Sequence, residues 1–278
     1  MLQSTFQHTP GIGPKIEQRL WASGVLDWTS AGERPPACLS SAQTNALARC
    51  LDLSARALED GNPRFFTGLL PAGLHWRLFP EFRGSAVYLD IETTGMDAWG
   101  AEITTIALYD GRTIQTFVQG RNLADFPDAV DAYDLIVTYN GKCFDVPFIE
   151  NYFHIRIDHA HIDLRYVLKR LGYAGGLKRC EKAMGIDRGH LDGVDGFFAV
   201  LLWQAYREEE DPRVLETLLA YNVEDVVNLE ALMVDAYNQN IMGTPYASTH
   251  RIPPPQAPEI PFRADARIIE AVRRRIFP

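Results

Sequence analysis

The chain has 278 residues, a formal net charge of −9, and 46% hydrophobic residues. This composition is typical of a globular protein with a packed core, and no apolar run approaches the roughly 18 residues that a membrane span needs. The acidic total argues against a protein that coats nucleic acid by charge alone, although an enzyme of nucleic acids can gain local positive charge from metal ions.

The four cysteines lie at wide, irregular spacings with no CxxC pair, which argues against a zinc site and against a disulfide framework. The first residues lack the charged and then apolar pattern of a secretory signal. We therefore expect a cytoplasmic protein with reduced thiols, and no association with a membrane.

Residues 1–80 read as short helices broken by Gly and Pro. Within them, "TPGIGPKIEQRLWASGV" places a Gly-Ile-Gly turn before a helix, and free backbone N–H groups at such a turn can bind phosphate. The segment resembles a helix-hairpin-helix motif. This resemblance implies DNA contacts through Gly11, Gly13 and Lys15, while plain packing of the hairpin is the alternative.

Residues 84–240 contain every clear strand: "SAVYLDIE", "EITTIALYD", "RTIQTFVQ" and "DLIVTYN", followed by the short extended piece "HAHIDL". An Asp-Gly pair between the second and third strands predicts a hairpin turn. Helices are expected at about 164–171, 176–184, 195–208 and 212–238. Antiparallel strands followed by strands alternating with helices predict an α/β fold with a mixed sheet.

Residues 241–278 begin with the proline-rich linker "RIPPPQAPEIP" and end in "RADARIIEAVRRRI", which predicts an amphipathic basic helix. Three possibilities stay open for this helix. It docks on the protein, it holds nucleic acid, or it has no partner.

Asp90 and Glu92 flank one isoleucine near the end of the first strand, so both side chains point from the same face. Adjacent carboxylates repel each other unless they lie on a solvated edge or a cation is bound between them. Asp145 follows the fourth strand, and ligand sites form at the carboxyl ends of strands in such sheets. Tyr221 and Asp225 are four residues apart in the last long helix and share one face.

Four carboxylates near element ends should not all stay ionised without a counter-charge. Hard divalent cations such as Mg²⁺ and Mn²⁺ prefer oxygen ligands and supply that charge. Two such ions about 3.5–4 Å apart can stabilise the attacking and leaving oxygens of phosphoryl transfer. Tyr221, one helical turn before Asp225, is placed to hold the attacking water or to help accept its proton.

The segments "DIETTG", "YNGKCFD" and "YNVED" occur in this order, and together they resemble the three motifs of the DEDD superfamily of 3′–5′ exonucleases. A Tyr four residues before the last Asp is similar to the DEDDy type, and the YprB-like group of bacterial predicted exonucleases is the most similar branch. The resemblance covers roughly residues 84–240. It implies an RNase H-like fold with a mixed five-stranded sheet flanked by helices.

The resemblance also implies the roles of the motif residues. Two divalent cations, Mg²⁺ or Mn²⁺, are expected to bind to the four motif acids, and a tyrosine is expected to position the attacking water. The catalytic residues implied in this way are Asp90, Glu92, Asp145, Tyr221 and Asp225.

Other matched positions imply contacts with the substrate. Thr93 and Thr94 match a turn that approaches the terminal nucleotide in relatives. Asn140 matches a residue near the second-motif acid, where its amide could reach the substrate or brace the loop.

Two further segments match the YprB-like pattern, "HIDL" at 161–164 and the Asp-Gly segment at 192–196. Asp163 is either an outer acid of the metal site or the cap of the helix that follows. His161 is expected to be structural, because hard ions prefer oxygen ligands.

Residues 156–190 carry more Lys and Arg than Asp and Glu, which reverses the overall charge. We expect Lys178, Arg179, Lys182 and Arg188 to follow a phosphate backbone, unless they form an ordinary solvated helix face.

These observations predict a metal-dependent 3′–5′ exonuclease that acts on single-stranded ends and releases nucleoside 5′-monophosphates. The hairpin-like motif slightly favours DNA over RNA as the substrate. Two alternatives stay open: an RNase H-like endonuclease with the same metal chemistry, and a nucleic-acid-binding module without turnover.

Overall fold

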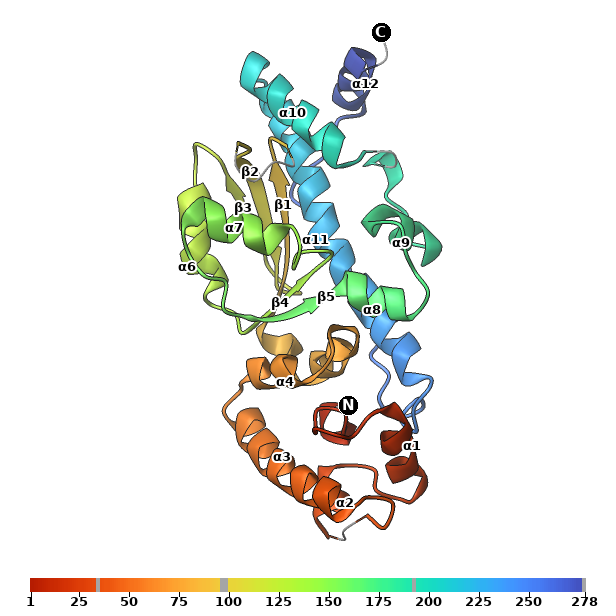
Figure 1. Ribbon diagram of the computed structural model, residues 1–278. Coiled ribbons are helices and arrows are strands. Elements are labelled where there is room, and N and C mark those ends of the chain that lie inside the picture. Colours follow the sequence, from red (N-terminus) through yellow and green to blue (C-terminus); the bar gives the residue numbers. More distant parts are fainter. Residues whose placement is uncertain (34–35, 96–99, 192–193, 277–278) are drawn as a thin grey trace.

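Five strands of the described residues form one sheet at the centre of the molecule (Figure 1). The computed structural model describes residues 1–33, 36–95, 100–191 and 194–276. The strands are β1 (Ala86–Thr93), β2 (Ile103–Tyr109), β3 (Ile114–Val118), β4 (Leu135–Thr138) and β5 (Ala160–Asp163). Their order in the sheet is β3-β2-β1-β4-β5. β2 is antiparallel to both of its neighbours, β1 and β3. β4 is parallel to both of its neighbours, β1 and β5. The expected mixed sheet is confirmed.

Helices pack on both faces of this sheet: α6 (Phe126–Val130) and α7 (Asp145–Phe153) on one face, and α11 (Pro212–Ile241) on the other. The other helices that follow the first strands are α8 (Leu164–Arg170), α9 (Leu177–Ala183) and α10 (Gly196–Glu209), with short 3-10 helices at Leu123–Asp125 and Gly189–Leu191. The four helices expected after "HAHIDL" are confirmed, with ends shifted by less than one turn. α11 begins at Pro212, whose missing N–H suits the first helical position, and the Asp211 side chain accepts a hydrogen bond from the Arg213 N–H (2.9 Å).

The central strand β1 is buried on both faces. Leu89 points to the side where α6 and α7 pack, whereas Tyr88 belongs to the core cluster that includes residues of α11. Because side chains alternate along a strand, Asp90 and Glu92 share the face of Tyr88 and point toward α11. The register that buries β1 therefore turns both acids inward.

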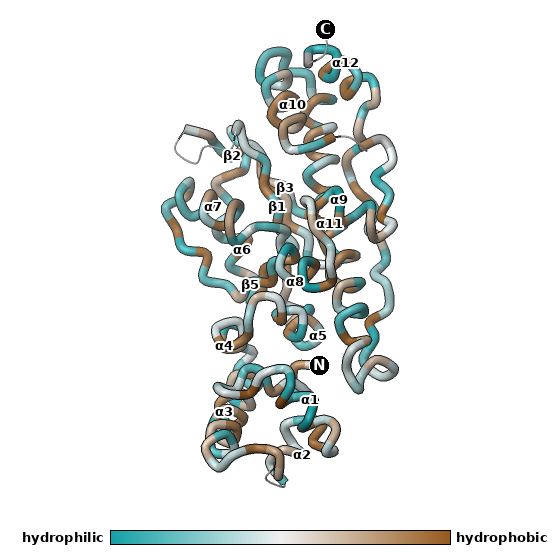
Figure 2. The backbone as a smooth tube through the Cα atoms, turned by 45° about the vertical axis from the view of Figure 1, so that its right-hand side comes forward, coloured by the Kyte–Doolittle hydropathy of each residue, from teal (hydrophilic) through white to brown (hydrophobic). Residues whose placement is uncertain are grey.

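The N-terminal region consists of short helices and lies beyond the amino-terminal end of β1 (Figure 1). Its elements are α1 (Pro14–Ala22), α2 (Trp28–Glu33), α3 (Ser41–Glu59), α4 (Pro63–Leu69) and α5 (Phe79–Phe82), with 3-10 helices at Leu2–Ser4, Ala72–Leu78 and Arg83–Ser85. α3 starts with a capping box in which Ser40 and Gln43 exchange hydrogen bonds. Its hydrophobic and hydrophilic residues alternate in Figure 2, as expected of a helix with one buried face.

A buried ion pair joins α1 to the 3-10 helix Ala72–Leu78. Arg77 Nη1 lies 2.7 Å from Glu17 Oε1, and the two side chains are only 3% and 1% exposed. The Glu17 carboxylate also accepts hydrogen bonds from the Thr5 hydroxyl (2.9 Å) and the Phe6 N–H (2.8 Å). Arg77 Nη2 lies 2.8 Å from the other oxygen, Oε2, so each oxygen of this carboxylate has fixed partners.

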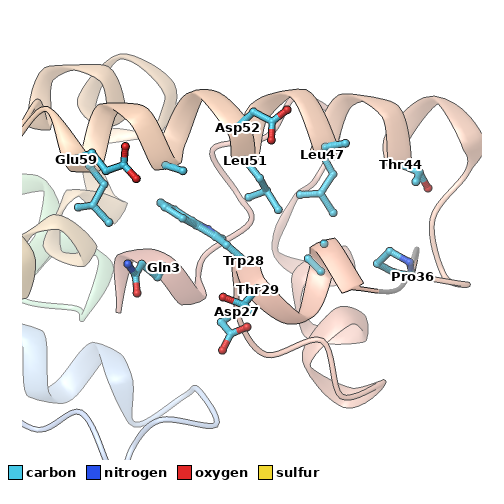
Figure 3. A pocket seen from close by; sticks show the side chains of 15 residues that line it. Gln3, Asp27, Trp28, Thr29, Pro36, Thr44, Leu47, Leu51, Asp52 and Glu59 are labelled. Atoms are coloured by element: carbon cyan, nitrogen blue, oxygen red, sulfur yellow. The ribbon is translucent and has the colours of Figure 1, made fainter.

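A cleft of about 630 Å³ lies in the N-terminal region between α3 and the segment that carries Trp28. Figure 3 shows Leu47 and Leu51 of α3 pointing toward that segment. The lining is mostly apolar and also includes acids such as Asp52 and Glu59. This cleft is separate from the acidic residues at the end of β1.

The C-terminal helix α12 (Ala266–Ile276) packs against α10 and α11. Ile269 and Val272 are buried in a cluster with residues of both helices. Arg275 pairs with Glu208 at 3.2 Å and with Glu209. Of the three possibilities for this helix, docking on the protein is therefore confirmed.

None of the helices in the described ranges combines the length and the apolar composition needed to cross a membrane.

Candidate metal centre

Three carboxylates converge at the end of β1. One oxygen from each of Asp90, Glu92 and Asp225 lies within 4.8 Å of the others. The first two come from β1, where the register with β2 shifts directly after Glu92, and the third comes from the facing side of α11. Side chains more than a hundred residues apart in sequence thus form one acidic cluster.

Asp145 lines the same cavity from the first turn of α7, but its carboxylate is not part of the group of three. Burial raises the pKa of Asp145 to about 7, and the charges of Asp163 and Asp225 add to this effect. The sequence predicted four acids at one site. Three lie close together and the fourth lies at the wall of the cavity.

The acidic cluster is electrostatically unfavourable as a set of free carboxylates. Burial, followed by the charge of Asp225, raises the pKa values of Asp90 and Glu92 well above their ordinary range. No residue in the described part of the chain donates a hydrogen bond to the Glu92 carboxylate. Such a cluster is stabilised by protons or by a bound cation, and its oxygen donors fit Mg²⁺ and Mn²⁺.

Two basic side chains contact the third acid of the cluster. The Lys178 ammonium forms an ion pair with Asp225 Oδ1, and Arg188 Nη2 lies 2.5 Å from the same oxygen. Burial disfavours the charge of Arg188, but Asp225 and Glu181 raise its pKa overall. Lys178 pairs with Asp225 here, and its expected contact with a phosphate stays a prediction.

Arg179 and Lys182 are exposed, on the part of α9 that lines a neighbouring cleft. This cleft, of about 580 Å³, shares Lys178 and Asp195 with the cavity above the acids. Of the four basic side chains that the sequence singled out, two therefore contact Asp225 and the other two lie at the surface.

Tyr221 lies one turn before Asp225 on α11 and is 2% exposed. The Lys178 ammonium lies 4.5 Å and the Arg188 guanidinium 5.4 Å from the centre of its ring. Burial, followed by the charges of Asp225 and Glu92, raises the pKa of Tyr221 well above its ordinary value. The hydroxyl therefore keeps its proton near neutral pH, which favours holding a water over accepting a proton.

Asn222 is a site residue that the sequence did not identify. Its Nδ2 donates to Asp90 Oδ2 at 2.8 Å, and its Oδ1 accepts from the Thr105 hydroxyl at 3.1 Å. The side chain is fully buried between α11 and the sheet. Its position beside Tyr221 in the third motif was visible, but its contacts depend on how α11 crosses β1 and β2.

The expected substrate contacts line the mouth of the cavity. This cavity, of about 640 Å³, is bordered by Thr93, Thr94 and Asn140 together with the four acids. The Thr93 hydroxyl donates to the Gly95 carbonyl (2.6 Å), and the Thr94 hydroxyl accepts from the Glu102 N–H (2.9 Å). Both threonines are thus fixed in the turn after β1.

Asn140 has a left-handed backbone, with φ of 67°, and its amide oxygen accepts from Arg165 at 2.5 Å. The next residue, Gly141, comes so close to Thr138 that an added Cβ would lie 2.3 Å from its hydroxyl oxygen. Asn140 therefore belongs to a tight loop held by its neighbours, in agreement with the alternative of bracing the loop.

Asp163 combines capping with support of this loop. Its Oδ1 accepts from the N–H groups of Arg165 (3.0 Å) and Asn140 (2.8 Å), and its Oδ2 accepts from the Lys142 N–H (3.1 Å). Capping of α8 is confirmed. His161 shares a 2.8 Å hydrogen bond with Thr138 and burial lowers its pKa to about 3, as expected of a structural residue.

A second feature that the sequence did not identify is Phe197, in the first turn of α10. It lines the cavity while 61% exposed. Asp195 caps α10 by accepting from the Phe198 N–H at 3.0 Å. Of the Asp-Gly segment at 192–196, residues 192–193 lie outside the described residues.

The turn that resembles a helix-hairpin-helix lies at the other end of the molecule from the acids (Figure 1). Gly11 has a φ of +82°, Gly13 caps α1, and Lys15 is exposed. The element before the turn is the 3-10 helix Leu2–Ser4 rather than an α-helix. DNA contact at this turn stays a prediction.

Known proteins similar to this chain include one curated relative and several solved structures. The uncharacterized protein YprB of Bacillus subtilis (strain 168) is 27% identical over 175 residues, which are 55% of this chain and 42% of YprB. The chain therefore spans less than half the length of this relative.

Among solved structures, a family B DNA polymerase from the archaeon Pyrobaculum calidifontis is 18% identical with a TM-score of 0.41, over 56% of this chain and 24% of the polymerase. A nuclease in its apo form is 21% identical with a TM-score of 0.40, over 57% of this chain and 73% of the nuclease. NrnC of Brucella melitensis bound to pGG is 15% identical with a TM-score of 0.31, over 63% of this chain and 93% of NrnC.

The family model described as the RNase_H superfamily matches residues 87–237, which include β1, the acidic cluster and most of α11. Because this match covers more than half of the sequence, the chain belongs to the RNase_H superfamily.

Proposed function

We propose that this protein is a metal-dependent 3′–5′ exonuclease of the DEDDy type that acts on single-stranded nucleic acid. One observation carries the proposal. Asp90, Glu92 and Asp225 converge in a cavity that Tyr221 and Asp145 also line. These are the residues of the three sequence motifs, and their order in the chain matches that of the resemblance.

The donor set fits two divalent cations, Mg²⁺ or Mn²⁺, because carboxylate oxygens are their preferred ligands. Asp90, Glu92 and Asp225 would hold them, with Asp145 completing the set from α7. When bound, such ions activate a water and neutralise the leaving oxygen of a phosphodiester.

The side chains of the protein position the reacting groups. The protonated hydroxyl of Tyr221 orients the attacking water, and the buried amide of Asn222 fixes the orientation of Asp90. The turn at Thr93 and Thr94 offers a rigid edge for the terminal nucleotide. Water attacks the phosphorus, the 3′ oxygen leaves, and a nucleoside 5′-monophosphate is released.

We propose that the site takes the end of a strand rather than an interior bond. The acids lie inside a cavity of about 640 Å³, which is in the range of sites that take one small ligand. An exposed Phe197 and the apolar side chain of Val200 line this cavity from α10. A terminal, unpaired nucleotide is the occupant that we propose for this cavity.

We further propose that the chain has three parts. Residues 84–240 form the exonuclease domain, residues 1–80 help to hold the substrate, and residues 241–278 brace α10 and α11 through α12. The contacts of α12 support its bracing role. DNA contact through Gly11, Gly13 and Lys15 would concern a strand long enough to reach the N-terminal region, since this region lies far from the acids.

The direct test is degradation of 5′-labelled single-stranded DNA and RNA, a blunt duplex and a single-stranded circle, with Mg²⁺ or Mn²⁺. We expect a stepwise ladder on linear strands that is lost in Asp90→Ala and in Asp225→Ala. Cutting of the circle would establish an endonuclease instead. Equal activity in both variants would show that the chemistry lies elsewhere.

Tyr221→Phe is a narrower test. If the hydroxyl orients the attacking water, the rate constant of the chemical step should fall by about 10²-fold, with little change in KM. An unchanged rate would remove Tyr221 from the mechanism.

A further inference from the structure

The ion pair between Lys178 and Asp225 places an ammonium group beside the three acids. We propose that Lys178 substitutes for a metal ion at Asp225 in the metal-free protein and moves to a substrate phosphate when divalent cations bind. This proposal deepens the proposed function and rests on it, because it assumes that the acidic cluster holds the cations.

The two basic side chains at Asp225 differ in how firmly they are held. Arg188 is 5% exposed, and its Nη1 lies 2.8 Å and 2.9 Å from the two oxygens of Glu181. Glu181 is itself buried and accepts from Asn228 at 3.0 Å. Arg188 is therefore anchored on the side away from Asp225.

Lys178 has no such anchor. Its side chain is 32% exposed, and within the described residues its only hydrogen bond goes to Asp225. It lies in the first turn of the short helix α9, and this helix follows Gly175 and Gly176, which both have positive φ. Apart from this ion pair, the ammonium has, among the described residues, only the face of the Tyr221 ring, 4.5 Å away, so Lys178 is the side chain that can leave.

Charge gives the reason for the exchange. Two divalent cations would balance the four carboxylates, so the Lys178 ammonium would lose its attraction to the cluster. At contact distances, a divalent cation beside Asp225 also repels an ammonium group strongly, since the site is partly shielded from water. Arg188 stays in place because Glu181 holds it.

The structure also shows where the released ammonium can go. Lys178 lines both the cavity above the acids and the adjacent cleft along α9. The exposed side chains of Arg179 and Lys182 lie along that cleft. A nucleic-acid strand with its 3′ end at the acids would place its next phosphates at this basic cleft.

Acetylation of lysines, followed by mass spectrometry, tests the exchange in the full chain without any turnover. We expect addition of Mn²⁺ to raise the labelling rate of Lys178 by about fivefold, the population change expected when a partly exposed ion pair breaks. Lys182, exposed on the same helix, is the internal control and should not change. An equal or lower rate at Lys178 with Mn²⁺ would overturn the proposal.

Lys178→Met gives a second readout, with Lys169→Met, at an exposed lysine of α8, as the matched control. Removal of a competing cation should tighten Mn²⁺ binding, measured by the spin resonance of free Mn²⁺, by about fivefold. With Ca²⁺ in place of Mn²⁺, the dependence of single-stranded DNA binding on salt should weaken by about one phosphate contact. Lys178→Arg should restore that contact. A merely structural lysine would instead weaken Mn²⁺ binding when replaced.

The two proposals fail in different ways. A chain that shows the exchange at Lys178 but no nuclease ladder would refute the exonuclease alone. A chain that produces the ladder without a change at Lys178 would refute the exchange alone. If Lys178→Met does not fold, the labelling of the unaltered protein still decides.

Discussion

Two buried carboxylates, Glu17 in the N-terminal region and Glu92 at the end of β1, have opposite surroundings. Both are less than 10% exposed. Burial alone would raise the pKa of Glu17, but the hydrogen bonds and charge of Arg77 lower it overall. Burial raises the pKa of Glu92 as well, and the nearby Asp225 raises it further.

The difference separates a structural acid from a candidate ligand-binding acid. The partners of Glu17 are all supplied by the protein, so nothing further is needed there. Glu92 lies among other acids and receives no hydrogen bond from the described residues. A buried carboxylate without fixed partners is a candidate ligand for a cation.

The largest effect is expected at the structural acid. Arg77→Met leaves the Glu17 charge buried and unpaired, which should lower the free energy of unfolding by about 3–5 kcal/mol. Urea denaturation measures this change. Arg64→Met removes an exposed ion pair with Asp158 and should change stability by less than about 1 kcal/mol. Equal effects of the two variants would contradict the comparison.

Glu92→Gln should have the opposite effect to Arg77→Met: a large loss of activity without a loss of stability. The rate on labelled single-stranded DNA is expected to fall by about 10²–10³-fold, because a ligand of the cations is lost. The stability of the metal-free protein should stay equal or rise, since a repelled charge is removed. Glu59→Gln, at an exposed carboxylate of α3, is the matched control. Clear destabilisation by Glu92→Gln would mean that this acid is structural.

The pH dependence of stability is a third test, with EDTA present. The pKa of Asp145 is raised from 3.8 to about 7 on folding, so the folded state binds more protons between these values. Stability should therefore fall as pH rises, by about 2 kcal/mol between pH 5 and pH 7.

Asp145→Asn should remove this contribution and flatten the stability curve, whereas Asp128→Asn at an exposed residue should not. Thermal unfolding across this pH range measures both. Parallel curves for the Asp145 variant and the unaltered protein would contradict the raised pKa.

The smallest effect is expected from Asn222→Ala. Loss of its hydrogen bond to Asp90 frees that carboxylate to rotate, which should weaken Mn²⁺ binding by about tenfold. Titration calorimetry measures the affinity. Asn240→Ala, further along the same helix, removes only a hydrogen bond to the Ala236 carbonyl and should have no effect. If both variants bind Mn²⁺ equally, Asp90 does not depend on Asn222.

Much of the fold could be predicted from local patterns. Alternation in β1 placed Asp90 and Glu92 on one face, and helical spacing placed Tyr221 on the face of Asp225. Both results depend only on the period of a strand or a helix. The mixed sheet followed from the order of strands and helices along the chain.

The remaining features depend on how distant elements pack. The contacts of Asn222 require the crossing of α11 over the sheet, and the ion pair of Lys178 requires the position of α9 beside α11. The exposure of Phe197 at the cavity requires the start of α10 to lie beside the acids. The periodicity of the sequence within one helix or strand does not predict these contacts between distant elements.

The most direct test of the central claim is an anomalous difference map from crystals of this protein grown with Mn²⁺. Strong peaks are expected between Asp90, Glu92 and Asp225, and the Glu92→Gln variant should lose at least one of them. A map from well-ordered crystals at high Mn²⁺ concentration with no peak at these three carboxylates would contradict the metal centre.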